Sequence, residues 1–500
     1  ASQGEPDPDT GDGVSMELIH PSLDNDLGGS WRAAERAPTP GKMNSVFAES
    51  NQIAPLIRQV RHRPKAPMSG EQVVVTAKVT DSDGVSSVEL DYQGVEPGNY
   101  IRIDDEAYNT AWETLAMSDD GVAPDELAED GIYSVAMPES LQTHRHLTRY
   151  RFRVEDTTGN RLQVPYADDP QPNFAYFTYD GVPAWSGAIS PGETPDITFS
   201  AETMNSIAVY HLIATRDDVE RQQWGGGSSF WNGTVVYDGE VYDHMRFSKR
   251  GRASLGQVGK EKWDWNFNRG HRFQARDNYG KRYEVKWREI NILPGTNPWW
   301  ANDVSTDGTI LNEAVGFRMF QLIGSPASNT NFFQMRVISQ ASEAPNDQYE
   351  GDLWGLYNAI QDPDNRFLRE RGLPDGNVYN WHGAGVKKNQ GATAAENDSD
   401  YRAFTSALRR TTPLETWQEL LNFDAYYSFN LGNLIVNNSD MRPGENMMSY
   451  IHPDGRTHPI PWDLDLTFEA APHLGRGDTP AWENLYHVLS HDSVDAGYQS

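Results

Sequence analysis

Apolar and polar residues alternate along most of the chain between residues 53 and 182. The runs with this two-residue period are EQVVVTAKVTD, VSSVELDYQG, IYSVAMP, LTRYRFRVEDTTGN and FAYFTYDG, and turn sequences such as DSDG, DDG and EDG separate them. Successive side chains of a strand point to opposite faces, so this alternation is typical of strands with one buried face. The spacing of strands and turns predicts an all-β sandwich over residues 53–182.

The pattern changes after VPAWSGAISPGETPD, a Pro- and Gly-rich segment that is typical of a linker. Strand-like runs continue, among them NFFQMRVI, EGDLWGLYNAI and the hairpin TVVYDGEVYDHMRFSKRG with Asp-Gly at its turn. Apolar residues then recur at helical spacing in DGTILNEAVGFRMFQLIG, where Asp307 can cap the helix, and in TPLETWQELLNFDAYYSFNLGNLIV. Strands with one helix first and further helices later predict a two-lobed α+β domain over residues 195–500.

Residues 1–52 are too few to form a domain of their own. They begin with the acidic, Pro- and Gly-rich stretch ASQGEPDPDTGDG, which predicts a flexible start. One short strand-like run, SMELI, follows, and the rest of the segment is rich in turn residues. We therefore expect a flexible start followed by one short strand.

Composition limits the chemistry that the chain can carry. Its formal net charge is −30, from 42 basic and 72 acidic residues, so free nucleic acid is a poor partner. It has no cysteine, which excludes disulfides, thiolate nucleophiles and Cys-ligated metals. No apolar run approaches the roughly 20 residues of a membrane-spanning helix. These properties are compatible with an exported bacterial protein, and we expect a piece of a larger protein whose last domain is incomplete at its C-terminal end.

One acidic segment inside the predicted sandwich is a candidate calcium site. SDDGVAPDELAEDG supplies Asp119, Asp120, Asp125 and Asp130, and carboxylate oxygens are ligands that Ca²⁺ prefers. The alternative is that these aspartates accept hydrogen bonds from the backbone of their own turns, as Asp commonly does. The sequence leaves both interpretations open.

The residues with the most specific chemistry lie near the C-terminal end. After the long helical stretch come a polar loop with Asp440 and Asn446, a hairpin around Asp454-Gly455, and then Asp463 and Asp465. Protein kinases use this order: a catalytic-loop Asp, a metal-binding Asn, a strand pair and a metal-binding Asp. Hard oxygen ligands without Cys or His suit Mg²⁺ or Mn²⁺. The alternative is a strand end with one capping carboxylate and one solvated carboxylate.

These motifs resemble one known family. NNSDMRPGENMMSYIHPDGRTHPIPWDLDLTF is similar to the C-terminal part of the spore-coat-protein-H (CotH) kinase family, whose hallmark is a PWDLD segment. Further segments that resemble this family are MRFSKRGRAS, KWDWNFNRGHRF, EGDLWGLYNAIQDPDNRFL and GNVYNWHG. The resemblance implies a two-lobed atypical protein kinase fold, with ATP and a divalent metal as cofactors and a protein as the phosphate acceptor.

The resemblance also implies roles for single residues. It places Asp440 beside the acceptor hydroxyl and assigns Asn446 and Asp463 to the metal, with Asp465 as a second ligand or a support. Lys262 is the candidate for the lysine that pairs with the phosphates. The other implied residues are its carboxylate partner and three cations over the nucleotide, namely Glu313, Arg246, Lys249 and Arg250. The alternative for the cations is that basic residues on a strand simply face water.

The segments before this domain resemble other modules. Residues 53–182 resemble a bacterial immunoglobulin-like domain, and residues 1–52 resemble the last strand and tail of a lamin-tail-like β domain. The expected fold is thus multidomain, with an immunoglobulin-like sandwich followed by an α+β, two-lobed kinase-like domain. Two functions stay open: an exported or cell-surface kinase that transfers the γ-phosphoryl group of ATP to a protein hydroxyl, or a non-catalytic, pseudokinase-like component of a bacterial surface or extracellular assembly.

Overall fold

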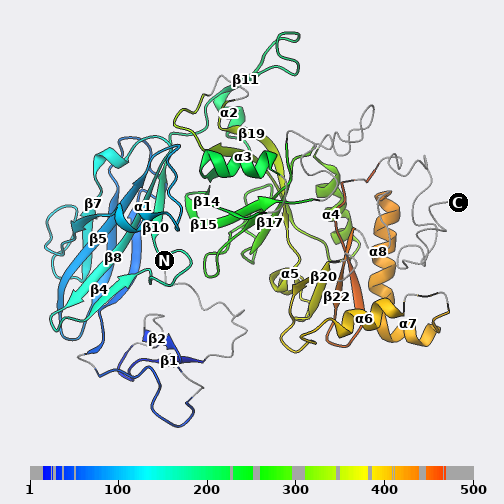
Figure 1. Cartoon of the computed structure of the whole chain (residues 1–500), viewed down its shortest axis with the longest axis horizontal. Helices are drawn as coiled ribbons and strands as arrows, with labels where there is room; N and C mark the ends of the chain where they lie inside the picture. Colours follow the sequence, from blue (N-terminus) through cyan, green and yellow to red (C-terminus); the bar gives the residue numbers. More distant parts are fainter. Residues whose placement is uncertain are drawn as a thin grey trace.

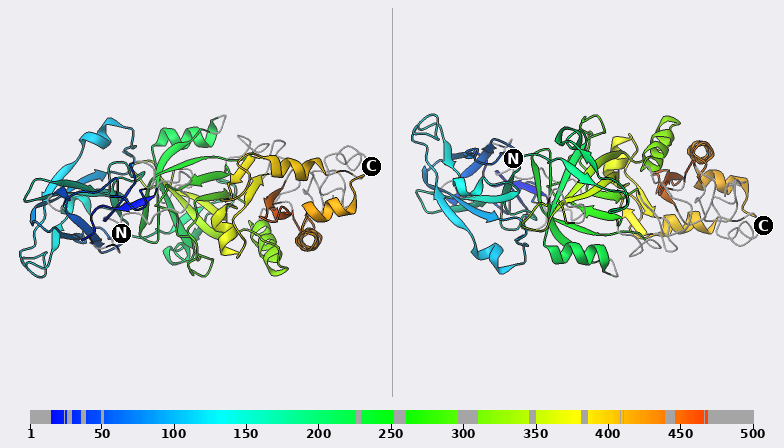
Figure 2. Two further views of the ribbon diagram at one scale, coloured as in Figure 1. Left: turned by 90° about the horizontal axis from the view of Figure 1, so that it is seen from below. Right: turned by 90° about the horizontal axis from the view of Figure 1, so that it is seen from above.

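The computed structural model of the chain describes residues 15–23, 25, 30–35, 39–49, 52–225, 229–251, 260–295, 310–344, 350–380, 386–407, 409, 411–438, 446–465 and 467–468. Most of these residues belong to three units that follow one another along the long axis of the molecule (Figure 1, Figure 2). We call them the sandwich (residues 56–178), the barrel (residues 208–361) and the C-terminal unit (residues 365–468).

A small antiparallel sheet precedes the sandwich. It pairs β1 (Met16–Leu18) with β2 (Trp31–Ala33). The guanidinium of Arg32 lies over the ring of Tyr166 at 4.7 Å, so this sheet contacts the sandwich. The strand predicted in SMELI is confirmed.

The described strands of the sandwich form two sheets, one in the order β3-β4-β7 and the other in the order β10-β8-β5-β6, with β9 beside β8. In β4 every second side chain is buried, as the alternation predicts. Side chains from both sheets, such as Val75 and Phe152, share one apolar core. The elements are β3 (Leu56–Arg63), β4 (Val74–Thr80), β5 (Val85–Val95), α1 (Glu106–Thr110), β6 (Glu113–Ala116), β7 (Ile132–Ala136), η3 (Glu139–Leu141), β8 (His146–Asp156), β9 (Arg161–Val164) and β10 (Phe174–Thr178).

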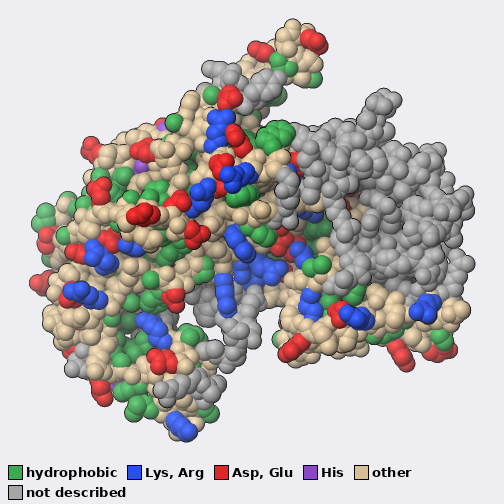
Figure 3. Space-filling model, in the orientation of Figure 1, with side chains coloured by type: hydrophobic (Ala, Val, Ile, Leu, Met, Phe, Trp, Pro, Cys, Tyr) green, Lys and Arg blue, Asp and Glu red, His purple; other side chains and the backbone are tan. Residues whose placement is uncertain are grey.

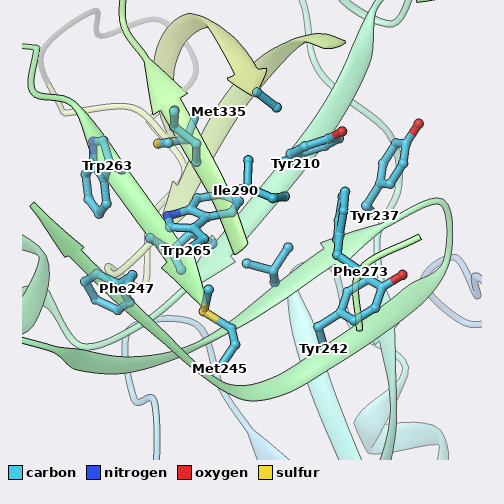
Figure 4. Close-up of a cluster of buried hydrophobic side chains, with 14 of the residues drawn as sticks. Tyr210, Tyr237, Tyr242, Met245, Phe247, Trp263, Trp265, Phe273, Ile290 and Met335 are labelled. Carbon is cyan, nitrogen blue, oxygen red and sulfur yellow. The ribbon is translucent and has the colours of Figure 1, made fainter. Parts of the chain in front are cut away.

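The strands of the next unit close into a barrel in the order β13-β14-β15-β16-β17-β19-β18. Its interior is filled by large side chains, including those of Tyr210, Trp265 and Phe273 (Figure 4). The barrel is therefore a packed core and not a channel. Its strands are β13 (Ala208–Ile213), β14 (Trp231–Tyr237), β15 (Glu240–Lys249), β16 (Trp263–Asn266), β17 (Glu289–Leu293), β18 (Thr330–Ile338) and β19 (Leu353–Gln361).

Smaller elements follow the sandwich along the chain, before and just after the first strand of the barrel. The hairpin of β11 (Trp185–Gly187) and β12 (Ile197–Phe199) projects from the molecule near α2 (Ala201–Met204) (Figure 1). The helix α3 (Arg216–Trp224) follows β13, and the side chain of Thr215 caps it by accepting the N–H of Asp218.

The sandwich and the barrel share a buried interface. Arg149 of β8 and Asp243 of β15 form a fully buried ion pair, with 2.7 Å between Nε and Oδ2. Asp243 also accepts hydrogen bonds from Thr234 and Asn173. Apolar side chains from both units pack beside this pair: Val95, Tyr100, Leu147, Phe177, Ile213, Val236 and Ile338. The two units are therefore joined through a continuous core.

The C-terminal unit combines a sheet, in the order β21-β20-β22-β23, with helices. The helix α4 (Asn312–Leu322), which the chain forms between β17 and β18, packs on this unit. A Cβ at Gly432 of α8 would lie 2.2 Å from a ring carbon of Phe320, so only glycine permits this close approach. The other elements are α5 (Asn365–Glu370), β20 (Asn377–Asn380), β21 (Val386–Asn389), α6 (Ser399–Ser406), α7 (Leu414–Leu420), α8 (Phe423–Ile435), β22 (Met447–Ile451) and β23 (Thr457–Pro461).

The structure confirms the β-rich character that the sequence predicts and refines its helices. Hairpins turn at Asp238-Gly239 and at Asp454-Gly455, as predicted. The helical stretch predicted over residues 412–436 is divided into α7 and α8, because Leu421 has extended backbone and Asn422 caps α8. The sequence did not predict that the strands close into a barrel. In the part of the chain that the structure describes, no helix has the length and apolar character needed to cross a membrane.

Candidate active site

The candidate site lies where the barrel meets the C-terminal unit, around Lys262. This residue directly precedes β16, whose Trp263 and Trp265 are buried in the barrel interior. By the strand period Lys262 faces the opposite way, out of the barrel. Its ammonium lies 3.2 Å from Oδ2 of Asp465 and 3.8 Å from Oδ1 of Asp463. The tertiary fold thus joins groups that are 203 residues apart along the chain.

The hairpin of β22 and β23 presents the two aspartates. The carbonyl of Asn446, just before β22, accepts the N–H of Trp462 at 3.3 Å and closes the open end of the hairpin. Asn446 and Asp463 have positive φ angles of 61° and 53°, a conformation that Asn and Asp tolerate better than most residues. Asp463 therefore turns the chain out of the strand at the start of the acidic segment. Arg250 lies over the ring of Trp462 at 5.4 Å.

The first turn of α4 approaches the same segment. Glu313 is 1% exposed, and its Oε1 accepts the N–H of Leu464 at 3.0 Å. The amide of Asn312 donates to the carbonyl of Thr467 at 3.0 Å. Lys262 forms its ion pairs with the two aspartates, and its interaction with Glu313 is electrostatic at longer range. The structure therefore places Glu313 beside the predicted partner without a direct ion pair.

Negative charge exceeds positive charge at this junction. Burial, followed by the charges of Asp463 and Asp465, raises the pKa of Glu313 well above its ordinary value. Burial opposes the charge of Lys262, but the two aspartates outweigh it and raise the pKa of the ammonium. Oδ1 of Asp463 and Oε2 of Glu313 are buried without a hydrogen-bond partner. The unsatisfied oxygen of Asp463, together with the excess of negative charge, suits a bound cation.

The other predicted cations are not brought together. The ammonium of Lys249 is buried and donates to the carbonyls of Gln223 and Gly225 at 3.1 and 2.9 Å, at the C-terminal end of α3. A lysine there satisfies helix carbonyls that have no partner within the helix. Arg246 is exposed and lies over the ring of Phe230 at 5.0 Å. Arg250 is the member of this set that lies beside the aspartates, through its contact with Trp462.

A second group of charges lies near the site, and the sequence reasoning missed it. The ammonium of Lys388 on β21 is 3.0 Å from a carboxylate oxygen of Glu289 and 3.1 Å from one of Asp362. Burial and then neighbouring carboxylates raise the pKa values of Glu289 and Asp264. The group connects β17, the residues after β19 and the C-terminal unit. The sequence feature that could have predicted this group is the presence of Asp264 and Glu289 beside large apolar residues in two strands.

The candidate calcium ligands bind their own loop. Asp119 accepts the N–H groups of Gly131 and Asp130 at 2.9 and 3.2 Å. Asp125 accepts the N–H of Gly121 at 2.7 Å, and Asp120 accepts that of Val122 at 2.9 Å. These contacts agree with the alternative of hydrogen-bonded turns.

Within the described ranges, no group of three or more His, Asp or Glu side chains could hold a metal ion. Asp440, the predicted catalytic residue, lies outside the described residues. The metal candidates that the structure does place together are thus Asp463 and Asp465, with Asn446 at the base of their hairpin.

Part of the chain matches a known protein family. Residues 268–491 match the family model described as CotH kinase protein, and no curated protein matches the chain. The matched range contains Glu313, Asp440, Asn446, Asp463 and Asp465, whereas the strand that begins after Lys262 precedes it. Residues 268–491 are therefore similar to the CotH kinase family.

Proposed function

We propose that the barrel and the C-terminal unit form a kinase that transfers the γ-phosphoryl group of ATP to a protein hydroxyl, with Mg²⁺ or Mn²⁺. The observation that carries this proposal is the approach of Lys262 to Asp463 and Asp465 across the junction of the two units. In kinases a lysine opposite a metal-binding aspartate holds the ATP phosphates, and Lys262, directly before β16, lies opposite Asp463 in this way. The match of residues 268–491 to the CotH kinase family model supports the same reaction class.

The residues present fit a divalent metal. Asp463 and Asp465 supply hard oxygen ligands, the amide of Asn446 can supply another, and one oxygen of Asp463 has no hydrogen-bond partner. When bound, the metal would neutralise charge on the phosphates. Three carboxyl groups, those of Asp463, Asp465 and Glu313, lie against the two cations Lys262 and Arg250, and this favours a further cation.

Side chains of the protein would position the ATP phosphates and the acceptor hydroxyl. Lys262 would bind phosphate oxygens, and Arg250, stacked on Trp462, adds a second cation beside the same segment. In this proposal Asp440 orients the acceptor hydroxyl. The barrel corresponds to the first kinase lobe, α4 to its helix, and the residues after β19 to the hinge between lobes.

The proposal extends to the setting of the enzyme. A Cys-free, strongly acidic chain with β modules before the kinase domain is compatible with an extracellular or cell-surface protein of bacteria. In that setting the sandwich would be an immunoglobulin-like domain, the β1–β2 sheet would be the end of a lamin-tail-like domain, and the acceptor would be a surface or matrix protein. Export can be tested by locating a tagged form of the chain after cell fractionation.

Thermal unfolding with and without ligands tests the central proposal. Mn²⁺ with ATP should raise the melting temperature, because a ligand that binds the folded state stabilises it. Asp463→Asn should abolish that increase, and Asp440→Ala should abolish phosphate transfer to protein while leaving the increase in place. No increase at millimolar ATP and Mn²⁺, together with no transfer that depends on Asp440, would contradict the proposal.

A non-catalytic binding module is the second candidate. It is favoured by the contacts of the two lysines, since Lys249 is used by α3 and Lys262 pairs with both aspartates and not with Glu313. Such a protein would bind a nucleotide or a partner without turnover. Stabilisation by ATP without any phosphate transfer to protein would distinguish it from the kinase.

A further inference from the structure

The contacts of α4 with the acidic segment point to a task that differs from pairing with the lysine. We propose that Glu313 and Asn312 are positioning residues, whose side chains hold the backbone of Leu464, Asp465 and Thr467 and so fix Asp463 and Asp465 opposite Lys262. The backbone contacts stand on geometry alone. Their consequence for metal binding rests on the proposed function.

The side chains of Glu313 and Asn312 form complementary hydrogen bonds with the acidic segment. Oε1 of Glu313 accepts the N–H of Leu464 at 3.0 Å. The neighbouring Asn312 donates through Nδ2 to the carbonyls of Thr467 at 3.0 Å and Asp465 at 3.4 Å. An acceptor and a donor at adjacent helix positions thus bind a donor and acceptors of one short segment.

The side chain of Leu464 packs against α4. This side chain is fully buried between the two aspartates and contacts α4 one turn beyond Asn312. A Cβ at Gly316 would lie 3.0 Å from a methyl group of Leu464, so the helix surface leaves little spare room for this side chain. The rings of Phe317 and Trp462 also lie near each other, with centroids 6.5 Å apart. The segment is therefore held by α4 through both backbone and side-chain contacts.

Burial of the Glu313 carboxyl group is energetically unfavourable by itself. A buried carboxyl group is unfavourable unless a hydrogen bond compensates it, and Glu313 is 1% exposed. Its bond goes to the N–H of Leu464, while the ammonium of Lys262 is bound by the two aspartates. Asp463 adopts a positive φ of 53°, which a free segment would not favour. Contacts on the residues that follow would hold this backbone in place.

Neutral and apolar replacements of Glu313 separate positioning from charge pairing. Glu313→Gln keeps a carbonyl oxygen for the N–H of Leu464 and removes the charge, whereas Glu313→Leu removes both. Amide hydrogen exchange in a peptide that contains Leu464 shows whether Glu313 and Asn312 hold this backbone, and it needs no ligand. Mn²⁺ titration reports the placement of the aspartates, and Arg318→Ala on the exposed side of α4 is the matched control.

We expect Glu313→Gln and Arg318→Ala to keep the slow exchange of Leu464 and to bind Mn²⁺ about as well as the wild type. Glu313→Leu should speed the exchange and weaken Mn²⁺ binding, each by about tenfold or more. Asn312→Asp, which keeps the size of the side chain but loses its donor, should shift both quantities in the same direction. This second variant carries the test if Glu313→Leu does not fold.

Two results would overturn the inference. One is equal damage by Glu313→Gln and Glu313→Leu, which would show that the charge and not the acceptor matters. The other is unchanged exchange of Leu464 in Glu313→Leu or, where that variant does not fold, in Asn312→Asp. If the wild type binds no Mn²⁺, the proposed function fails. The exchange measurements still decide whether Glu313 and Asn312 hold the backbone of the acidic segment.

Discussion

Two buried clusters of charged residues lie at the two junctions of this molecule, and they are built differently. Between the sandwich and the barrel, Arg149 and Asp243 pair at 2.7 and 3.0 Å, and further donors satisfy Asp243. Between the barrel and the C-terminal unit, the single ammonium of Lys262 faces Asp463 and Asp465, with Glu313 close by. The first cluster is balanced, and the second has surplus negative charge and unsatisfied oxygens.

The pKa shifts express the same difference. At the first junction burial opposes the charge of Asp243, but Arg149 outweighs it, so the pKa of this carboxyl is lowered. At the second junction burial and neighbouring carboxylates raise the pKa of Glu313. A balanced buried pair fixes the two units relative to each other, whereas an unbalanced cluster favours a further cation.

Lys and Arg side chains also gather on the middle of the molecule in one view, beside scattered acidic groups (Figure 3).

The largest predicted effect is at the balanced junction. Asp243→Ala should lower the free energy of unfolding by about 3–5 kcal/mol, because it leaves Arg149 buried without its partner. Chemical denaturation followed by tryptophan fluorescence measures this change. Arg149→Met combined with Asp243→Leu should cost less than Asp243→Ala alone, because no charge is then left unpaired.

A matched control for this change lies on the same strand. Glu240 of β15 pairs with Lys65 of the sandwich at 2.6 Å, but both side chains are about half exposed, at 50% and 49%. Glu240→Gln should therefore change the free energy of unfolding by at most about 1 kcal/mol. Equal losses for Asp243→Ala and Glu240→Gln would remove the distinction between a buried pair and a solvated one.

The second prediction concerns the unbalanced junction. Without metal, Asp463→Asn should leave the free energy of unfolding within about 1 kcal/mol of the wild type, because it removes one of the crowded negative charges and Asn tolerates positive φ. Mn²⁺ affinity, measured by calorimetry, should fall by at least about 100-fold. A loss of stability as large as that of Asp243→Ala would show that the cluster is structural.

The third prediction uses pH at the balanced junction. His211 is buried there, and burial followed by the charge of Arg336 lowers its pKa to about 3. The unfolded chain takes up a proton below the ordinary pKa of 6.5, and the folded chain does not. Stability from this group is thus complete above pH 6.5 and falls with the pH, by at most about 1.4 kcal/mol per pH unit.

His211→Phe should make this fall shallower, since Phe carries no proton and fits beside the rings of Phe177 and Tyr179. Denaturation curves between pH 6.5 and 4.5 measure the slope. His244 contributes in the same direction, because burial also lowers its pKa, to about 4, and it serves as the internal comparison. An unchanged slope in His211→Phe would show that other groups cause the pH dependence.

The smallest effect is predicted for Arg246. Its side chain is exposed and lies over the ring of Phe230, a contact worth about 0.5–1 kcal/mol at an exposed site. Arg246→Ala should lower the free energy of unfolding by no more than about that amount. If the residue also contacts the nucleotide, the concentration of ATP needed for half-maximal stabilisation should rise, and Arg318→Ala should leave it unchanged.

Local signals predicted much of this architecture. The alternation in β4 and the Asp-Gly turns at residues 238–239 and 454–455 are short-range features, and the structure reproduces them. Barrel closure depends on the parallel pairing of β13 with β18, which lie more than a hundred residues apart and whose register no local pattern encodes. The division of the helical stretch at Leu421 was missed because its apolar spacing continues through the break.

The sequence by itself determined the chemical inventory of this protein: no thiol, a strongly negative net charge, and a hairpin that ends in two carboxylates. The motifs around that hairpin also indicated the similarity to the CotH kinase family that the family model finds over residues 268–491. Only the tertiary structure decided which groups meet, since it brought Lys262 to Asp463 and Asp465, assigned Lys249 to a helix end and gave Glu313 to the backbone of Leu464. The physical reason is that side-chain contacts across two units depend on burial and direction, which residue type and spacing along a chain do not specify.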